Sequence, residues 1–424
     1  MFHCTSLSLP PEATIKREST RPVEFRQPGF DEAFDASTLF YDLILSRNKH
    51  GNNLIFIGPP FLNLFPFFYG GRIGGQPLAS TISNYYLRGL CSDVWIPNWD
   101  IDAVDLEFDF GSYRLTPQSA ATHLYRGRRV LYTHSRDNEV RWIVDWVQFH
   151  ARNHGANAVL IYDNASTKYA GEDLERSLKE AFPNLEINVV HWPYKFGPQG
   201  FKGGWWDSHF CQAGAFQDAR FRFLDSASSV LNCDIDELVV SENGESIFDI
   251  TEKSRNGCTV FNGRWISNVN IGTHPDLNSP SDFRHGDFRY LKRTEPASPK
   301  KWCVVPWRCK LDESWANHTV SGMDLASSYS DSFSYRHFQS ISTNWKYQRV
   351  RPVVFDPKLH QFDETLDEAL VRAEIAHLET RAPSSLLEIV RERCDRIKSL
   401  AMKWKRRLRN VAHHLRWLVS QLNP

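Results

Sequence analysis

The chain has 424 residues, which is too long for one small core and fits two domains or one large domain with extensions. Its 50 basic and 50 acidic residues balance, so no net charge favours nucleic acid as a partner. The eight cysteines form no CxxC pair, which is typical of reduced thiols in a cytoplasmic protein.

Residues 1–50 are polar and contain prolines, and we expect a loosely ordered segment there. No basic segment followed by an apolar one opens the chain, as a signal peptide would require. The most apolar stretch, residues 54–69, is interrupted by prolines and is too short to span a bilayer. Short strand patterns at 54–57, 94–96 and 106–110 predict a β-rich N-terminal region over residues 51–127.

From residue 128 onward, strand and helix patterns alternate. Apolar residues at helical spacing precede Gly155, which is a typical helix C-terminus. The expected strands are 130–133, 158–162, 187–190 and 230–231, and the expected helices are 140–154, 172–182 and 209–221. This alternation predicts an α/β fold with a doubly wound, mostly parallel sheet over residues 128–360.

An acidic block follows the fourth of these strands. Asp234, Asp236 and Glu237 lie among apolar residues. Alternate residues of a strand share a face, so both aspartates would point the same way at the strand end. Carboxylates held this close repel one another unless a cation lies between them. We therefore expect a divalent metal site; in an enzyme that uses nucleotide sugars, the metal neutralises the diphosphate leaving group.

An isolated Asp-x-Asp pair also occurs by chance, chiefly as aspartates of turns or helix caps. Phosphatases of the haloacid dehalogenase type also carry such a pair, but near the chain start and followed by Thr or Val. Here the pair lies mid-chain and Glu-Leu follows it. Asp163 ends an earlier strand of the same predicted sheet, and ligands bind at the carboxyl ends of parallel strands. One cleft can therefore hold Asp163 and Asp234.

Three blocks in order resemble glycosyltransferases of the GT-A fold, and the closest resemblance is to the family 2-like and family 92 group. The blocks are residues 129–139, 161–166 and 233–237, with further similarity at 301–306, 317–320 and 336–338. The resemblance covers about residues 128–350. Phe338 departs from it, because the family more often has Tyr there, and the N-terminal region has no counterpart in it.

Carried over residue by residue, the resemblance implies a nucleotide-sugar site. Asp163 would contact the base or ribose, and Asp236 would be the main ligand of Mn²⁺ or Mg²⁺. Asp234 would contact ribose, metal or metal-bound water, and His318 would approach the metal or diphosphate. A helix cap for Asp163 and a surface role for His318 are the alternatives. The remaining donor-binding candidates are Thr133, His134, Arg136, Glu139 and Asn164.

Members of this group are generally inverting, and an inverting enzyme needs a carboxylate that deprotonates the acceptor hydroxyl. Asp282 and Asp287, in a polar loop after the acidic block, are the candidate bases. An ion pair with the neighbouring Arg284 and His285 explains these two acids equally well. Trp265 is the candidate acceptor-stacking residue, with core packing as the alternative.

The segment 361–424 is predicted to form basic, amphipathic helices at the C-terminus. Apolar residues repeat at steps of four and three over 386–422, and Lys and Arg cluster at 403–409. Three interpretations stay open: packing on the protein's own body, lying on an anionic membrane surface, and dimerising as a coiled coil.

The sequence thus predicts a metal-dependent, inverting hexosyltransferase that uses a nucleotide sugar, expected to be a UDP-sugar. The acceptor would be a glycan or lipid-linked glycan, for example in bacterial surface polysaccharide or lipopolysaccharide synthesis. We expect the protein in the cytoplasm or peripherally on the inner face of a membrane. The alternative is a non-catalytic carbohydrate-binding or scaffold protein with the same fold, which the 14 Trp and 28 Phe residues also suit.

Overall fold

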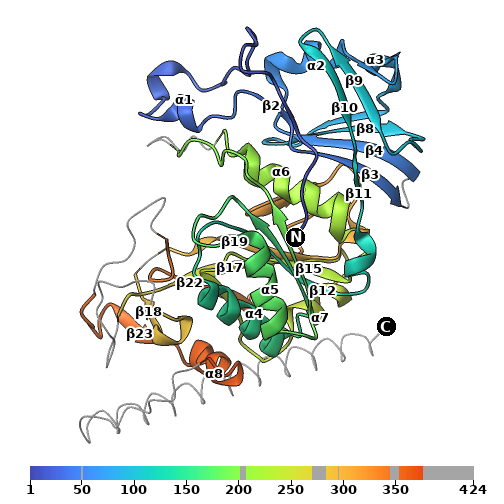
Figure 1. The fold of residues 1–424 in the computed structure, drawn as a ribbon. Coiled ribbons are helices and arrows are strands. Elements are labelled where there is room, and N and C mark those ends of the chain that lie inside the picture. Colours follow the sequence, from blue (N-terminus) through green and yellow to red (C-terminus); the bar gives the residue numbers. More distant parts are fainter. Residues whose placement is uncertain (49–50, 201–206, 270–282, 295, 344–352, 376–424) are drawn as a thin grey trace, which may run out of the picture. The chain divides into compact units, whose positions relative to one another are not determined.

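The computed structural model describes residues 1–48, 51–200, 207–269, 283–294, 296–343 and 353–375 (Figure 1). The candidate base Asp282 and most of the predicted C-terminal helical segment lie outside these ranges. Among the helices of the described ranges, none is both long enough and apolar enough to cross a bilayer.

A ten-stranded mixed sheet occupies the centre of residues 129–362. Four neighbouring strands in the order β14-β13-β12-β15 are parallel, as the alternating pattern predicted. They are buried almost throughout, since a parallel sheet is covered on both faces. Their bounds are β12 Arg129–Ser135, β13 Ala158–Asp163, β14 Glu186–His191 and β15 Ser229–Asn232.

The other half of the sheet is largely antiparallel, so the expectation of a mostly parallel sheet holds only for the first half. β15 pairs with β19, and β19 pairs with β17, in both cases antiparallel. β16, which follows the acidic block, pairs with β22, and β22 runs parallel to β17. The bounds are β16 Glu237–Ser241, β17 Cys258–Ile266, β18 Tyr290–Lys292, β19 Ser298–Val304, β20 Ser314–Ala316, β21 Thr319–Ser321, β22 Phe333–Phe338 and β23 His360–Phe362.

Helices cover both faces of the parallel strands. The apolar sides of α4 and α5 join one core cluster, whereas α6 and the π-helical segment after it join the cluster on the opposite face. α4 ends at Gly155, whose φ of 75° is left-handed, as expected for a helix C-terminus. The bounds are α4 Val140–His154, α5 Gly171–Ala181, α6 Phe210–Asp218, the π-helical segment Ala219–Leu224, α7 Ile247–Lys253 and α8 Glu364–Arg372.

The N-terminal region contains a five-stranded sheet of order β11-β3-β4-β8-β7 and a four-stranded sheet of order β10-β9-β5-β6. Residues 1–50 were expected to be loosely ordered, but β3 begins at Asp42, so part of this segment belongs to the five-stranded sheet. The bounds are β1 Leu7–Ser8, β2 Thr38–Phe40, β3 Asp42–Asn48, β4 Gly51–Gly58, β5 Arg72–Ile73, β6 Gln76–Pro77, β7 Asn84–Leu87, β8 Ser92–Pro97, β9 Val104–Phe108, β10 Gly111–Leu115, β11 Gln118–Ser119, α1 Phe30–Ala33, α2 Phe65–Tyr69 and α3 Leu78–Thr81.

Charged groups join this region to the ten-stranded sheet and its helices. The guanidinium of Arg222 lies 2.9 Å from the Asp42 carboxylate, and both side chains are buried. Arg88, in the turn between β7 and β8, donates hydrogen bonds to the carbonyls of Leu311 (2.7 Å) and Glu313 (2.8 Å). The turn also carries Leu90 to the cavity described next.

Candidate functional site

A cavity of about 710 Å³ opens where β12, β13 and β15 end. From the parallel half of the sheet it is lined by His134, Ser135, Arg136, Asn138 and Asn164. The acidic turn after β15 and residues of β17, β19 and β22 line its other side. The cavity therefore lies at the edge of the sheet where parallel α/β folds bind ligands.

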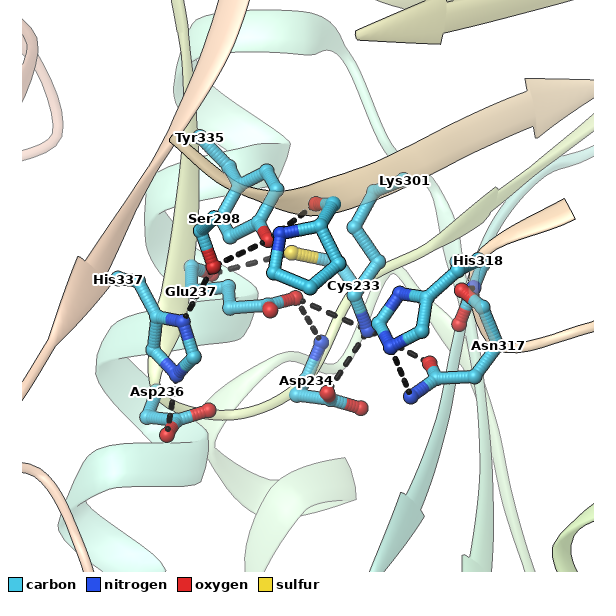
Figure 2. Close-up of polar contacts among 12 residues, drawn as sticks. Cys233, Asp234, Asp236, Glu237, Ser298, Lys301, Asn317, His318, Tyr335 and His337 are labelled. Carbon is cyan, nitrogen blue, oxygen red and sulfur yellow. Dashed lines mark hydrogen bonds and ion pairs between the residues drawn. The ribbon is translucent and has the colours of Figure 1, made fainter. Parts of the chain in front are cut away.

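The acidic block forms a tight turn between β15 and β16. The N–H of Glu237 donates to the carbonyl of Asp234 (3.0 Å), and the N–H of Phe338 donates to the carbonyl of Asp236 (2.8 Å). Asp234 and Asp236 both line the cavity, as predicted from their spacing, but they do so from a turn and not from an extended strand. Their carboxylates have different partners (Figure 2).

The carboxylate of Asp236 contacts a histidine of β22. Oδ2 of Asp236 lies 3.1 Å from Nε2 of His337, and the His337 ring stacks on the indole of Trp265 at a centroid distance of 3.9 Å. Ligand atoms of Asp236, Glu237 and His337 all lie within 4.8 Å of one another. Carboxylate oxygens suit Mn²⁺ and Mg²⁺, and the imidazole adds one nitrogen ligand to the set.

The other nitrogen of His337 is held by a hydroxyl pair. Nδ1 of His337 lies 3.0 Å from Oγ of Ser298, which in turn lies 2.8 Å from the hydroxyl of Tyr335. A serine hydroxyl can donate or accept, so the pair supports either tautomer of His337. In the tautomer with Nδ1 protonated, Nε2 presents a lone pair to the cavity.

The buried Lys301 forms ion pairs with the carboxylates of Asp234 and Glu237. Its ammonium lies 2.7 Å from Asp234 Oδ2, 3.2 Å from Glu237 Oε2 and 2.8 Å from Asn317 Oδ1. Burial alone would lower the pKa of Lys301, but the two carboxylates outweigh it and raise the pKa. Burial raises the pKa of Glu237 to about 7, although Lys301 partly offsets this effect. Lys301 therefore stays charged, and Asp234 is engaged by an ammonium group.

The resemblance implied Asp234, Asp236 and His318 as the metal set, whereas the compact group contains Asp236, Glu237 and His337. His318 lines the same cavity, but its Nδ1 lies 3.0 Å from the carbonyl oxygen of Lys300 and its Nε2 lies 3.3 Å from the Asn317 amide. Because a carbonyl only accepts, Nδ1 of His318 carries the proton and Nε2 a lone pair.

On the donor side, His134, Arg136 and Asn164 line the cavity. Burial lowers the pKa of His134 to about 4, so this imidazole is neutral near pH 7. It stacks on Phe196, another lining residue, with 8° between the ring planes. The amide of Asn164 donates to the carbonyls of Trp192 and Tyr194, 2.8 Å each, and so fixes the segment that precedes Phe196.

The other three donor candidates, Thr133, Glu139 and Asp163, are not among the residues that line the cavity. Thr133 is buried because strand alternation places it with Leu131 on the opposite face from His134. Glu139 begins α4 and forms an ion pair with Lys168.

The carboxylate of Asp163 accepts hydrogen bonds from the hydroxyl and the N–H of Ser166, which makes it a turn residue.

The candidate base Asp287 also has a structural role. Its carboxylate accepts from the N–H of Arg284 at 2.6 Å and caps the short 3-10 segment His285–Asp287. Trp265, by contrast, does line the cavity, where it packs on His337. The site residues without an assigned role in the sequence interpretation are Glu237, Ser298, Lys301, Asn317 and His337. Glu237 was visible as the third acid of its block, but nothing local marks Ser298.

Comparison with known proteins gives one family. The model of the family described as glycosyltransferase family 92 matches residues 135–379, which is more than half of the chain. The matched range includes Asp236, Glu237 and His337. No curated protein matches the chain significantly. Among solved structures, the WbbM bifunctional glycosyltransferase in its apo form is similar at a TM-score of 0.25 and 14% identity. The similarity covers 38% of this chain and 26% of that protein.

Proposed function

The chain belongs to glycosyltransferase family 92, and we propose that it transfers a sugar from a nucleotide-sugar donor to a glycan acceptor in the cavity beside the acidic turn. The observation that carries this proposal is the group Asp236, Glu237 and His337 in the cavity beside the carboxyl ends of the parallel strands. The parallel order β14-β13-β12-β15 followed by the antiparallel β19 supports a GT-A type of fold.

Asp236 and His337 would hold Mn²⁺ or Mg²⁺, with Glu237 as the third ligand. When bound, the cation supplies positive charge that stabilises the departing nucleoside diphosphate. Lys301 supports the same site, because it neutralises Asp234 and lowers the repulsion between neighbouring carboxylates. The stacked Trp265 and the Ser298 hydroxyl orient the His337 ring from two directions.

We propose that the nucleotide lies along His134–Asn138, with a UDP-sugar as donor. The neutral His134 and the ring of Phe196 offer flat apolar surface that a base can contact. Arg136 is exposed at the cavity and offers a guanidinium to a phosphate group. Asn164 supports this side by anchoring the Trp192–Tyr194 backbone.

For an inverting reaction, one group must take the proton of the acceptor hydroxyl. Asp282 stays the candidate from the sequence, since Asp287 is engaged in its cap. His318 is a second candidate, because its Nε2 carries a lone pair at the cavity wall. The glycan or lipid-linked acceptor and the peripheral membrane contact of the C-terminal segment stay predictions from the sequence.

A donor-hydrolysis assay tests the proposed function. The full chain is incubated with a panel of nucleotide sugars and Mn²⁺ or Mg²⁺, and released nucleoside diphosphate is measured. We expect slow release from one class of donor with water as acceptor. Absence of release and of donor binding across the panel would contradict the proposal and favour the carbohydrate-binding or scaffold alternative.

A further inference from the structure

A second histidine contacts the acidic turn from inside the protein. His285 is fully buried, and its Nε2 lies 2.9 Å from the carbonyl oxygen of Ile235, the residue between Asp234 and Asp236. A carbonyl oxygen only accepts, so Nε2 carries the proton and donates. His285 does not line the cavity and has no direct access to a substrate there.

With this hydrogen bond, the three successive carbonyls of the turn each have a partner. The carbonyls of Asp234 and Asp236 accept from the backbone N–H groups of Glu237 and Phe338. The Ile235 carbonyl accepts instead from a side chain 50 residues further along the chain. The Ile235 side chain is itself buried in the core, so the peptide that joins Ile235 to Asp236 is held on both sides.

The His285 ring is itself fixed by its surroundings. Nδ1 of His285 lies 3.6 Å from the buried carboxylate of Asp145 on α4. The same carboxylate accepts a hydrogen bond of 2.7 Å from Nε of Arg284. The indole of Trp142, one turn earlier on α4, donates to the carbonyl of Phe283 at 2.7 Å. The ring edge packs against Phe338 at a centroid distance of 5.0 Å. Helix α4 therefore anchors the imidazole that holds the turn.

We propose that His285 is a positioning residue for the cation and donor site. It fixes the plane of the Ile235–Asp236 peptide, and this plane sets the direction in which the Asp236 carboxylate enters the cavity toward His337. Asp145 and Arg284 hold His285 in place and so belong to the same positioning network. This inference rests on the proposed function, because it concerns the binding of Mn²⁺ and a nucleoside diphosphate beside Asp236.

The chain contains a matched control. His154 is also buried, and its Nε2 donates to the carbonyl of Val239 at 2.8 Å, on the strand that follows the acidic turn. Its loss would remove the same type of hydrogen bond from the same sheet without touching the turn. A general loss of stability would therefore appear in variants of both histidines, whereas loss of positioning would appear only at His285.

The test measures binding of Mn²⁺ with UDP to the full chain by calorimetry, with thermal unfolding recorded for each variant. His285→Leu removes the donor, and His285→Gln keeps an N–H near the position of Nε2. We expect His285→Leu to weaken binding about tenfold or more, as loss of groups that orient ligands typically does. His285→Gln should restore most of the affinity, and His154→Leu should leave it unchanged even where its unfolding temperature falls.

Equal affinity of His285→Leu and the wild-type chain would overturn the inference, as would equal losses in His285→Leu and His154→Leu. If His285→Leu does not fold, the decision falls to Asp145→Asn, which should weaken binding because it loosens His285. Wild-type affinity in Asp145→Asn would then contradict the network. A wild-type chain that binds neither Mn²⁺ nor UDP would remove the proposed function and this inference with it, an outcome distinct from the others.

Discussion

The indole of Trp265 and the imidazole of His337 lie nearly parallel, with 16° between their planes and centroids 3.9 Å apart. The two residues face each other across the parallel pair β17–β22, in which Trp265 and His337 are direct partners. The register of two strands thus fixes the plane of the ring whose Nε2 contacts Asp236. A shift of β22 by one residue would turn His337 to the other face of the sheet, away from Trp265.

Replacing Trp265 should therefore affect the rate more than the fold. Stacked aromatic pairs contribute about 0.5–1.5 kcal/mol beyond their buried area, so we expect Trp265→Ala to lower turnover up to about tenfold. Trp265→Phe keeps a ring and should retain most of the activity. Turnover and the KM for acceptor are measured together, since a role in stacking on the acceptor would also raise that KM. The exposed Trp307 is the control, and equal effects of Trp307→Ala and Trp265→Ala would contradict this account.

Replacing Lys301 should destabilise the protein. Lys301→Met preserves the bulk of the side chain but leaves Asp234 and Glu237 without their cation. Loss of one partner from a buried ion pair costs about 3–5 kcal/mol, which urea unfolding can measure. Lys300 is exposed, so Lys300→Met should stay within about 0.5 kcal/mol of the wild-type stability. A Lys301→Met chain as stable as Lys300→Met would show that the carboxylates do not need the ammonium.

Acidification should act through buried histidines of α4. Burial lowers the pKa of His150 to about 3 and that of His154 to about 4, whereas an unfolded histidine titrates near 6.5. Below pH 6.5 the unfolded chain takes up protons that the folded chain excludes, so each group reduces stability as the pH falls from about 6.5 toward about 4. At pH 5 the reduction is about 2 kcal/mol for each histidine.

Carboxyl groups with raised pKa values, such as Glu237, increase the stability as the pH falls over part of this range. The contribution of His154 is therefore obtained by comparing the wild-type chain with a His154 variant. The free energy of unfolding is measured at pH 7.5 and pH 5 for the wild-type chain and for His154→Gln, which keeps a donor for the Val239 carbonyl. We expect the variant to lose about 2 kcal/mol less on acidification. An equal or larger loss in the variant would contradict the assignment of a neutral buried His154.

Local patterns predicted the parallel half of the fold. The apolar runs of β12 to β15 and the helical spacing before Gly155 are signals contained within short segments. The antiparallel half depends on pairings such as β17 with β22, which no local pattern specifies. The mixed character of the sheet could not be predicted from alternation that ends near residue 240.

The candidate site was predictable to a similar extent. Three acids in four positions predicted the acidic site. Which group each carboxylate contacts depends on residues distant in the sequence, such as Lys301 and His337. A lysine is normally exposed, so nothing in the sequence marks Lys301 as a buried cation. Asp163 ends its strand as the pattern predicted, but the pattern does not specify that Ser166, three residues later, engages its carboxylate.

Turnover of the nucleotide sugar by Asp236→Asn tests the central claim most directly. With the donor identified by the hydrolysis panel, release of nucleoside diphosphate is compared among the wild-type chain with Mn²⁺, the same chain in excess EDTA, and Asp236→Asn with Mn²⁺. The exposed Asp312→Asn serves as the matched control. We predict that EDTA and Asp236→Asn each lower release by about 100-fold or more, while Asp312→Asn retains wild-type activity. Full release by Asp236→Asn, or by the wild-type chain in EDTA, would contradict the assignment of Asp236 as the group that holds the catalytic cation.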